Sequence, residues 1–243
     1  MKKLALSTAL LALVSGAAFA QDVVRLGTEG GYPPYNYIDD NGQVAGFERE
    51  VGDELCARAG LTCEWVLNDW DSIIPNLASG NYDAILAGMS ITPEREEVVD
   101  FTNEYYPPVN SAYIGLSDDI DVDNGVIAAQ TGTIQAAYVA ESNAELLEFA
   151  TPDETVAAVR NGEADAVLAD ADYLGSQVIA SGGELVFIGE GVALGGGIGA
   201  AVRTGDDALR EKLNEAIESM KADGTLNELL VKWFSETGEV PQF

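Results

Sequence analysis

The chain contains no histidine, and among its 243 residues it has only two cysteines and twelve lysines and arginines. The absence of histidine excludes Ser-His-Asp and Cys-His catalysis and histidine-ligated metal sites. Two thiols alone do not form a structural zinc site, so we expect no metal and no cofactor. A carboxylate-based enzyme remains open, although with 41 acidic residues two carboxylates close in sequence mean little.

The shortage of basic residues leaves a net charge of −29. Phosphate binding requires a basic face, so this charge excludes nucleic acid as a partner, and it excludes anionic membrane surfaces on the same ground. It favours a cationic ligand or partner, or a salt-rich medium that screens self-repulsion. A role in solubility alone is equally compatible with it.

Long hydrophobic runs are also missing, and the apolar stretch at residues 4–14 is too short to span a membrane. It follows Lys2 and Lys3 and leads to Ala18-Phe19-Ala20, which is typical of a secretory signal peptide. We predict a leader over residues 1–20 and export to the periplasm, with a membrane anchor or a buried helix as the alternative. An exported chain allows Cys56 and Cys63 to pair.

Strands and helices alternate along the rest of the chain, which predicts an α/β fold with parallel strands covered by helices. Strands are expected at residues 23–28, 62–67, 82–87, 126–130 and 164–170. Helices are expected at residues 46–60, 71–78, 206–221 and 226–234; two more begin at residue 93 and at about residue 134, and another ends at residue 162. Two break points interrupt the series, at Pro107-Pro108 and at 195–197. If both are hinges, residues 22–109 and 198–243 form one lobe and residues 110–197 form the other, with a ligand in the cleft between them. The alternative is one continuous domain.

Four clusters of residues fall where a predicted strand ends, and open α/β sheets bind ligands at such ends. "TEGGYPPYNY" offers Glu29 as a charge and Tyr32 as a flat face, and "NDWDSIIP" offers Trp70, whose indole can stack on a cation. The alternatives are an ordinary loop with partly buried tyrosines and a tryptophan in the core.

The third cluster contains Gly88, Ser90 and Arg95, in "LAGMSITPEREE". Thr92-Pro93 predicts a helix start, where the helix dipole is positive and an arginine is out of place unless an anion joins it. Free N–H groups and a guanidinium together suit a carboxylate. The alternative is local pairing of Arg95 with neighbouring glutamates.

The fourth cluster joins Gly132 in "TGTIQ", which makes a second N–H nest for an anion, to Asp170 at the end of "AVLAD". Asp170 is suited to an ammonium group, or alternatively to capping the following helix. Taken together, the four clusters describe a free amino acid whose carboxylate is held from both lobes.

These segments resemble the polar amino-acid-binding proteins of ABC importers, which are bacterial solute-binding proteins with a two-lobe, type II Venus-flytrap fold. The resemblance covers residues 22–236, and its most specific parts are "GTEGGYPPYNY", "GFEREVGDELC", "DSIIPNLASGNYDAILAGMSITPEREEVVDFT", "TGTIQ", "NGEADAVLAD" and "MKADGTLNELLVKWF". It implies two hinge crossings, a binding protein rather than an enzyme, and delivery of an L-amino acid to a membrane permease. The spacing of Cys56 and Cys63 is similar to the disulfide of the basic-amino-acid subgroup.

The resemblance also implies a role for each site residue. The ligand carboxylate would meet Arg95, Ser90, Thr133 and Ile134; the ammonium would meet Asp170, Gly88 and Ser90; and the side chain would lie among Glu29, Tyr32, Trp70, Ala87 and Met89. An acidic residue at the Glu29 position is typical of binders of arginine, lysine, ornithine or histidine, and the surrounding loop is also similar to opine binders.

Two departures from the family pattern affect the specificity of the pocket. Ala87 and Ala169 stand where relatives carry serine and glutamine, so two polar contacts are missing. We therefore expect a monomeric periplasmic receptor for an amino acid, most simply a basic one or an opine. The rivals are an enzyme similar to cyclohexadienyl dehydratase and a sensory ligand-binding protein.

Overall fold

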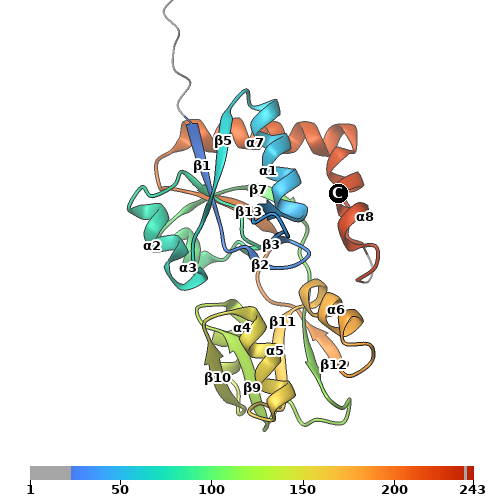
Figure 1. The fold of residues 1–243 in the computed structure, drawn as a ribbon. Helices are drawn as coiled ribbons and strands as arrows, with labels where there is room; N and C mark the ends of the chain where they lie inside the picture. The colour runs from blue at the N-terminus through green and yellow to red at the C-terminus, as the bar shows by residue number, and fades with distance from the viewer. Residues whose placement is uncertain (1–22, 238–239) are drawn as a thin grey trace, which may run out of the picture.

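Two separate five-stranded sheets organise the chain, as a computed structural model of residues 23–237 and 240–243 shows (Figure 1). The first sheet has the strand order β5-β1-β6-β13-β7 and the second has the order β10-β9-β11-β8-β12. The first is built from β1 (Val23–Thr28), β5 (Thr62–Leu67), β6 (Ala84–Ile85), β7 (Asp100–Tyr106) and β13 (Ile198–Val202). The second is built from β8 (Ser111–Gly115), β9 (Val126–Gln130), β10 (Glu145–Phe149), β11 (Ala166–Asp170) and β12 (Val186–Val192). The predicted leader lies outside the described residues.

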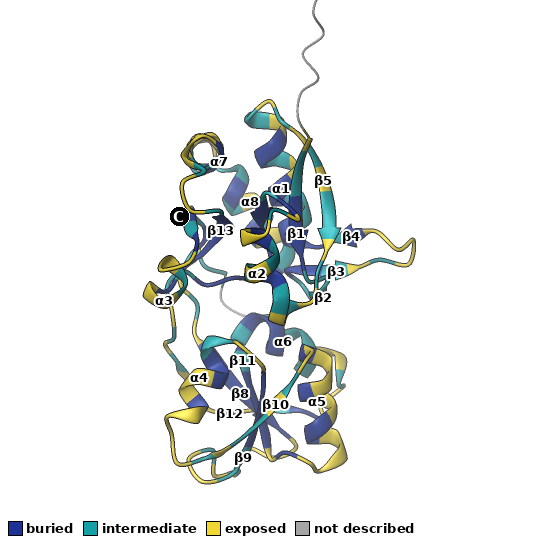
Figure 2. Cartoon of the chain, turned by 90° about the vertical axis from the view of Figure 1, so that its left-hand side faces the viewer, coloured by how far each residue is buried: buried dark blue, intermediate teal, exposed yellow. Residues whose placement is uncertain are grey.

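Helices cover both sheets, and a small third sheet sits beside the first. The helices on the first sheet are α1 (Phe47–Arg58), α2 (Ile73–Ala78), α3 (Pro93–Glu96), α7 (Asp207–Asp223) and α8 (Thr225–Phe234), and the 3₁₀ turn η1 (Trp70–Ser72) precedes α2. Those on the second are α4 (Ile134–Ala140), α5 (Pro152–Asn161) and α6 (Ala171–Ala180). The small sheet contains β2 (Gly31–Tyr32), β3 (Asn36–Ile38) and β4 (Val44–Ala45). Figure 2 shows that the strands in the middle of each lobe are buried while the helices expose their outer faces.

The sheets are mixed rather than parallel, which corrects the sequence prediction. β1 runs parallel to β5 and β6, and β9 runs parallel to β10 and β11. However, β13 is antiparallel to both of its neighbours, and so is β8. A parallel neighbour needs a crossover connection, usually a helix, and neither β8 nor β13 has one because each enters its sheet directly from the other lobe.

The chain crosses between the two sheets through residues 107–110 and again through residues 193–197. The second crossing packs against the end of β7, just before the first crossing: a Cβ atom at Gly197 would lie 2.7 Å from the carbonyl oxygen of Tyr106. Only glycine allows this approach of two backbone segments. The lobe boundaries expected at 109/110 and 197/198 fall within or at the end of these crossings.

Helix α5 illustrates how local sequence sets the element bounds. Thr151 and Glu154 form a reciprocal capping box, and Pro152 occupies the first helical position. Gly162 ends the helix with φ of 73°, in the left-handed region that favours glycine. The predicted helix end at Gly162 is therefore confirmed.

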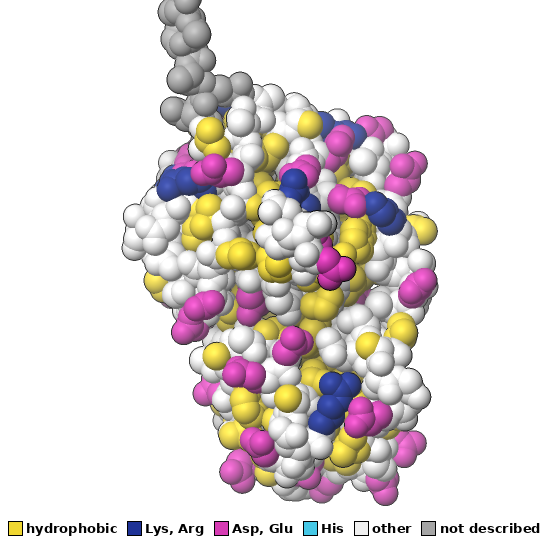
Figure 3. All heavy atoms as spheres, in the orientation of Figure 1, with side chains coloured by type: hydrophobic (Ala, Val, Ile, Leu, Met, Phe, Trp, Pro, Cys, Tyr) yellow, Lys and Arg dark blue, Asp and Glu magenta, His cyan; other side chains and the backbone are white. Residues whose placement is uncertain are grey.

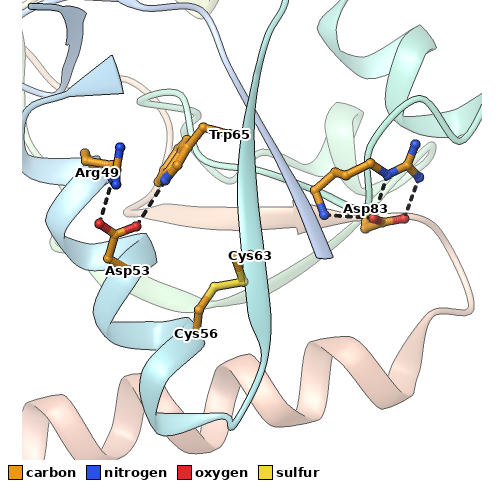
Figure 4. Close-up of a disulfide and its surroundings, with 7 residues drawn as sticks. Arg49, Asp53, Cys56, Cys63, Trp65 and Asp83 are labelled. Atoms are coloured by element: carbon orange, nitrogen blue, oxygen red, sulfur yellow. Dashed lines mark hydrogen bonds and ion pairs between the residues drawn. A yellow bond between two sulfur atoms is a disulfide. The ribbon is translucent and has the colours of Figure 1, made fainter. Parts of the chain in front are cut away.

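The predicted pairing of Cys56 and Cys63 is also confirmed, because the two residues form a disulfide between the end of α1 and β5 (Figure 4). Their Cα atoms are 6.2 Å apart and their sequence separation is 7. The bond ties the helix to the edge strand of the first sheet.

We expect the double substitution Cys56→Ser/Cys63→Ser to lower the free energy of unfolding by about 2 kcal/mol, because a short closed loop restricts the unfolded chain only modestly. Urea unfolding measures this loss. The control is the wild-type protein after thiol reduction, which should lose the same amount. An unchanged unfolding midpoint in both samples would contradict the prediction.

Acidic side chains are spread over both lobes on the face in Figure 3, whereas basic ones are few. Within the described residues, no helix is both long and apolar enough to cross a membrane.

Candidate ligand-binding site

A cavity lies between the two lobes, at the ends of β1, β6, β9 and β11. It encloses about 330 Å³ of space not filled by atoms, part of which is open to solvent. The first lobe lines it with Glu29, Tyr32, Trp70, Ala87, Gly88, Ser90 and Arg95, and the second lobe lines it with Gln130, Thr133, Ile134, Gln135 and Asp170. All four clusters predicted from the sequence therefore meet at one cavity.

Arg95 supplies a positive charge to the first-lobe wall. Its Nη1 donates to the carbonyl oxygen of Ser90 at 2.8 Å, and its guanidinium carbon lies 5.4 Å from the Trp70 ring centroid. Burial lowers the pKa of Arg95 to about 10, and the charge of Asp170 acts in the opposite direction. Among the described residues no carboxylate forms an ion pair with Arg95, so the alternative of a local ion pair is not realised, although the charge of Glu94 also raises the pKa of Arg95.

The dipole of the helix that carries Arg95 adds less positive potential to the cavity than the sequence predicted. α3 is a single turn, and Thr92 Oγ1 accepts the backbone N–H of Arg95 at 3.3 Å. A one-turn helix has few aligned peptide dipoles. The guanidinium, rather than the helix end, is therefore the positive group that faces the cavity.

Asp170 supplies a buried carboxylate from the second lobe, at the end of β11. Oδ2 accepts the Tyr32 hydroxyl at 3.0 Å and Oδ1 accepts Gln135 Nε2 at 2.8 Å. Burial raises the pKa of Asp170 to about 6, while the Tyr32 hydrogen bond and the charge of Arg95 lower it. Asp170 occupies the N-cap position of α6, but its side chain makes no capping hydrogen bond, so the alternative capping role is wrong.

Glu29 supplies a second carboxylate, which follows β1 in the first lobe. Its Oε1 accepts Gln130 Nε2 from the second lobe at 2.5 Å. Burial raises the pKa of Glu29 to about 7, the Gln130 hydrogen bond lowers it, and the charges of Asp69 and Asp153 raise it further. Glu29 therefore changes its charge near neutral pH.

The two predicted aromatic residues both line the cavity, in different settings. The Tyr32 ring stacks on Tyr173 of α6, with centroids 4.3 Å apart, and on Tyr35 at 5.7 Å. Trp70 begins η1 and is only partly buried, packing against the Ile73 cluster on one side while lining the cavity, so it is not a core tryptophan.

Backbone segments of both lobes line the cavity, at Gly88 and at the start of α4. Gly88 has φ of 63°, and its N–H donates to Glu48 Oε1 at 2.7 Å. At the start of α4, Thr133 Oγ1 accepts the N–H of Ala136 at 3.1 Å. The first N–H groups of a helix have no partner within it, and Ile134, which begins α4, lines the cavity.

Not every predicted contact residue reaches the cavity. Met89 is fully buried in a hydrophobic cluster with Ile73 and Leu77 and does not line the cavity, whereas its neighbours Gly88 and Ser90 do. Ala87 lines it and is 3 % exposed.

Two glutamines of the cavity wall were not predicted as site residues. Gln130 ends β9, so the rule that ligands bind at strand ends could have identified it. Gln135 lies in the first turn of α4, directly after the "TGTI" segment. An amide gives no charge signal in the sequence, which is why both were overlooked.

Further polar contacts join the lobes beside the cavity. Asp172 of α6 accepts the hydroxyl of Tyr106 at the end of β7 and that of Tyr35 at 3.4 Å. Thr237, which follows α8, donates to the same carboxylate at 3.3 Å. Burial raises the pKa of Asp172, and these three hydroxyl groups lower it.

Two lobes, each with its own sheet, that enclose a polar cavity with charges of both signs are typical of solute-binding proteins. The chain belongs to the bacterial extracellular solute-binding proteins, family 3, whose family model matches residues 24–236. The predicted resemblance and the two-lobe fold are thereby confirmed.

Similar proteins agree with this assignment. The L-arginine-binding protein of Pseudomonas aeruginosa is 36 % identical over 252 residues, covering 97 % of each chain. A solved structure of a periplasmic His/Glu/Gln/Arg/opine family-binding protein from Silicibacter pomeroyi, in complex with lysine, is 65 % identical with a TM-score of 0.87. That match covers 90 % of this chain and 100 % of the other.

A relationship to an enzyme lineage also exists. An ancestral amino-acid-binding protein described as a precursor of cyclohexadienyl dehydratase is 30 % identical with a TM-score of 0.78, over 87 % of this chain and 95 % of that one. The fold alone therefore does not separate a binding protein from a dehydratase.

Proposed function

We propose that this protein is a periplasmic receptor that binds a basic L-amino acid, or an opine derivative of one, and delivers it to an ABC transporter permease. The observation that carries the proposal is the distribution of charge around one cavity. Arg95 is a cation without an ion-pair partner among the described residues, Asp170 is a carboxyl group of the opposite lobe, and Glu29 is a carboxyl group that a bound cation would hold ionised. A zwitterion with a cationic side chain matches these three groups.

In this proposal each end of the amino-acid head group is held by residues of both lobes. Arg95 binds the ligand carboxylate, assisted by the backbone N–H groups of Ser90 and Ile134 and by contact with Thr133, because charge-assisted hydrogen bonds are the strongest available. The ammonium group donates to Asp170, to the Ser90 hydroxyl and to the Gly88 carbonyl. Tyr32, Trp70 and Ala87 surround the side chain and Glu29 accepts its cationic end.

Closure of the lobes follows from this division of contacts. The described residues of 22–109 and 198–243 move as one lobe and residues 110–197 as the other, about the two crossings. A ligand that contacts both lobes binds the closed state more tightly than the open one, so it shifts the population toward closure. The closed form, acting as a monomer exported by its leader, is the one that a permease recognises.

A thermal-shift panel with the chain from residue 21 onward tests the ligand class. Arginine, lysine, ornithine, histidine and octopine should raise the melting temperature more than glutamine or glutamate, because a ligand at 100 times its Kd stabilises the folded state by about 2.7 kcal/mol. A shift with glutamate alone would contradict a basic ligand, and no shift with any amino acid would contradict the receptor function.

A second candidate function is a dehydratase on the same fold, and one observation favours it. Glu29 has a pKa of about 7, the range expected of a general acid at neutral pH. Against this, two donors already hold Asp170 in the position that suits an ammonium group. Turnover of prephenate or arogenate by the purified protein would overturn the assignment as a non-enzymatic receptor.

A further inference from the structure

A buried carboxylate of the second lobe is held by three hydroxyl groups of the first lobe. Asp172, in the first turn of α6, is 5 % exposed and is not part of the lining of the ligand cavity. Its Oδ2 accepts the hydroxyl of Tyr106 and, at 3.4 Å, that of Tyr35. Its Oδ1 accepts the hydroxyl of Thr237 at 3.3 Å. A buried carboxylate that loses its donors is costly, so this contact favours the arrangement in which the two lobes face each other.

The packing around this contact fixes both of its sides. Tyr35 and Tyr106 are fully buried, and the ring of each lies 4.9 Å from that of Phe234, measured between centroids. On the other side, a Cβ atom at Gly175 would lie 2.8 Å from the carbonyl oxygen of Thr237. Helix α6 and the segment after α8 therefore meet with no side chain between them, and Figure 1 shows α6 next to the end of α8.

The same helix connects this contact to the ligand site, because α6 begins directly after Asp170. We propose that Asp172 is a positioning residue: with Tyr35, Tyr106 and Thr237 it forms an interlobe latch that stabilises the closed protein and sets the affinity for all ligands by a common factor. The inference rests on the proposed function and deepens it, since the latch controls closure without touching the ligand.

The location of the latch outside the cavity determines how it affects binding. The apparent affinity of a ligand falls in proportion to the fraction of protein in the binding-competent state. A contact between protein groups adds the same free energy to the closed state whichever ligand is bound. Loss of the latch should therefore weaken every ligand by the same factor and leave the order of ligands unchanged. The loss should appear as faster dissociation, because opening breaks the latch before the ligand leaves.

The first test measures the affinity of Asp172→Ala and Tyr106→Phe for lysine, arginine and glutamine by calorimetry. Asp172→Ala should weaken all three ligands by about 10- to 100-fold, the effect of losing hydrogen bonds to a charged group, and Tyr106→Phe by about tenfold. The matched control is Asp83→Asn, because the Asp83 carboxylate pairs with Arg25 and Arg203 of its own lobe. It should lower the free energy of unfolding without altering any affinity.

Gly175→Ala tests the same latch while leaving every polar group in place. The added methyl group would force α6 away from Thr237, so each ligand should bind about tenfold more weakly and dissociate faster in stopped-flow measurements. Alanine is a better helix former than glycine, so the ligand-free variant should not show a matching loss of stability. Melting temperatures of the ligand-free variants check that each one is folded.

The outcomes separate the latch from the proposed function. Unchanged affinities in Asp172→Ala and Gly175→Ala, or losses that differ between lysine and glutamine, would overturn the inference while leaving the proposed function intact. A loss of unfolding free energy with no change in affinity would show that the contact is merely structural, and would overturn it as well. A wild-type protein that binds no amino acid would overturn the proposed function itself.

Discussion

Arg95→Ala is expected to weaken every amino-acid ligand by about 100- to 1,000-fold, which corresponds to about 3–4 kcal/mol. The reason is that the substitution leaves a ligand carboxylate inside the cavity without its charged partner. The free energy of unfolding should change by less than about 1 kcal/mol, because Arg95 has no ion-pair partner among the described residues and its burial lowers its own pKa to about 10. Calorimetry measures the first effect and urea unfolding the second.

Two further substitutions control this result. Arg95→Lys keeps the charge but loses the planar fork that pairs with a carboxylate, so its affinity should lie between those of the wild type and Arg95→Ala. Arg160→Ala removes an exposed ion pair with Glu184 at 3.1 Å in the second lobe and should alter neither quantity appreciably. Wild-type affinity in Arg95→Ala would rule out the carboxylate-binding role.

The fold was predictable where local chemistry sets the structure. Helix α5 begins at a capping box and ends at a left-handed glycine, and both signals can be read from a few consecutive residues. The mixed sheets were not predictable from such signals, because the direction of β8 and β13 depends on which lobe the chain comes from. That information lies in contacts between distant segments, not in the residues of either strand.

The site was predictable to the extent that strand ends and charge identify it. Arg95 follows the buried strand β6 and Asp170 ends the buried strand β11, and the topology brings them to one cavity. The individual roles came from resemblance to a family, since no spacing rule assigns a carboxylate or an ammonium to a residue. Position in the sequence was misleading for Met89: it lies between two cavity-lining residues, yet its side chain packs into the core. Gln130 could not be identified from its neighbours in the sequence, because it contacts Glu29, about one hundred residues earlier.

Glu29 should make the affinity for basic ligands depend on pH near neutrality. Burial raises the pKa of Glu29 to about 7, with Asp69 and Asp153 adding to the effect, and a bound cation favours the ionised form. Binding a cation is therefore coupled to loss of a proton below pH 7. We expect lysine affinity to be constant between about pH 7 and pH 8, where the ligand ammonium stays protonated, and to fall by up to about tenfold per pH unit below pH 7. Calorimetry between pH 5 and pH 9 measures this dependence.

Glu29→Gln should remove that dependence while weakening lysine more than glutamine at pH 8. The decline below about pH 6 should persist for both ligands, because Asp170, whose pKa is raised to about 6, must be ionised to bind the ammonium group. Glutamine serves as the control in the wild type, since its uncharged side chain gives no reason for a transition at pH 7.

The stability of the ligand-free protein gives an independent check, because its dependence on pH is expected to be opposite to that of lysine affinity. A carboxyl group with a folded-state pKa above its unfolded value stabilises the fold at low pH, and this contribution is lost as pH rises through the folded-state pKa, about 7 for Glu29. Glu29→Gln should therefore be more stable than the wild type at pH 8, and the difference should shrink toward pH 5. A lysine affinity that stays the same from pH 5 to pH 9 in the wild type would show that a bound cation does not ionise Glu29. A loss of stability at pH 8 in Glu29→Gln would show that burial does not raise the pKa of Glu29.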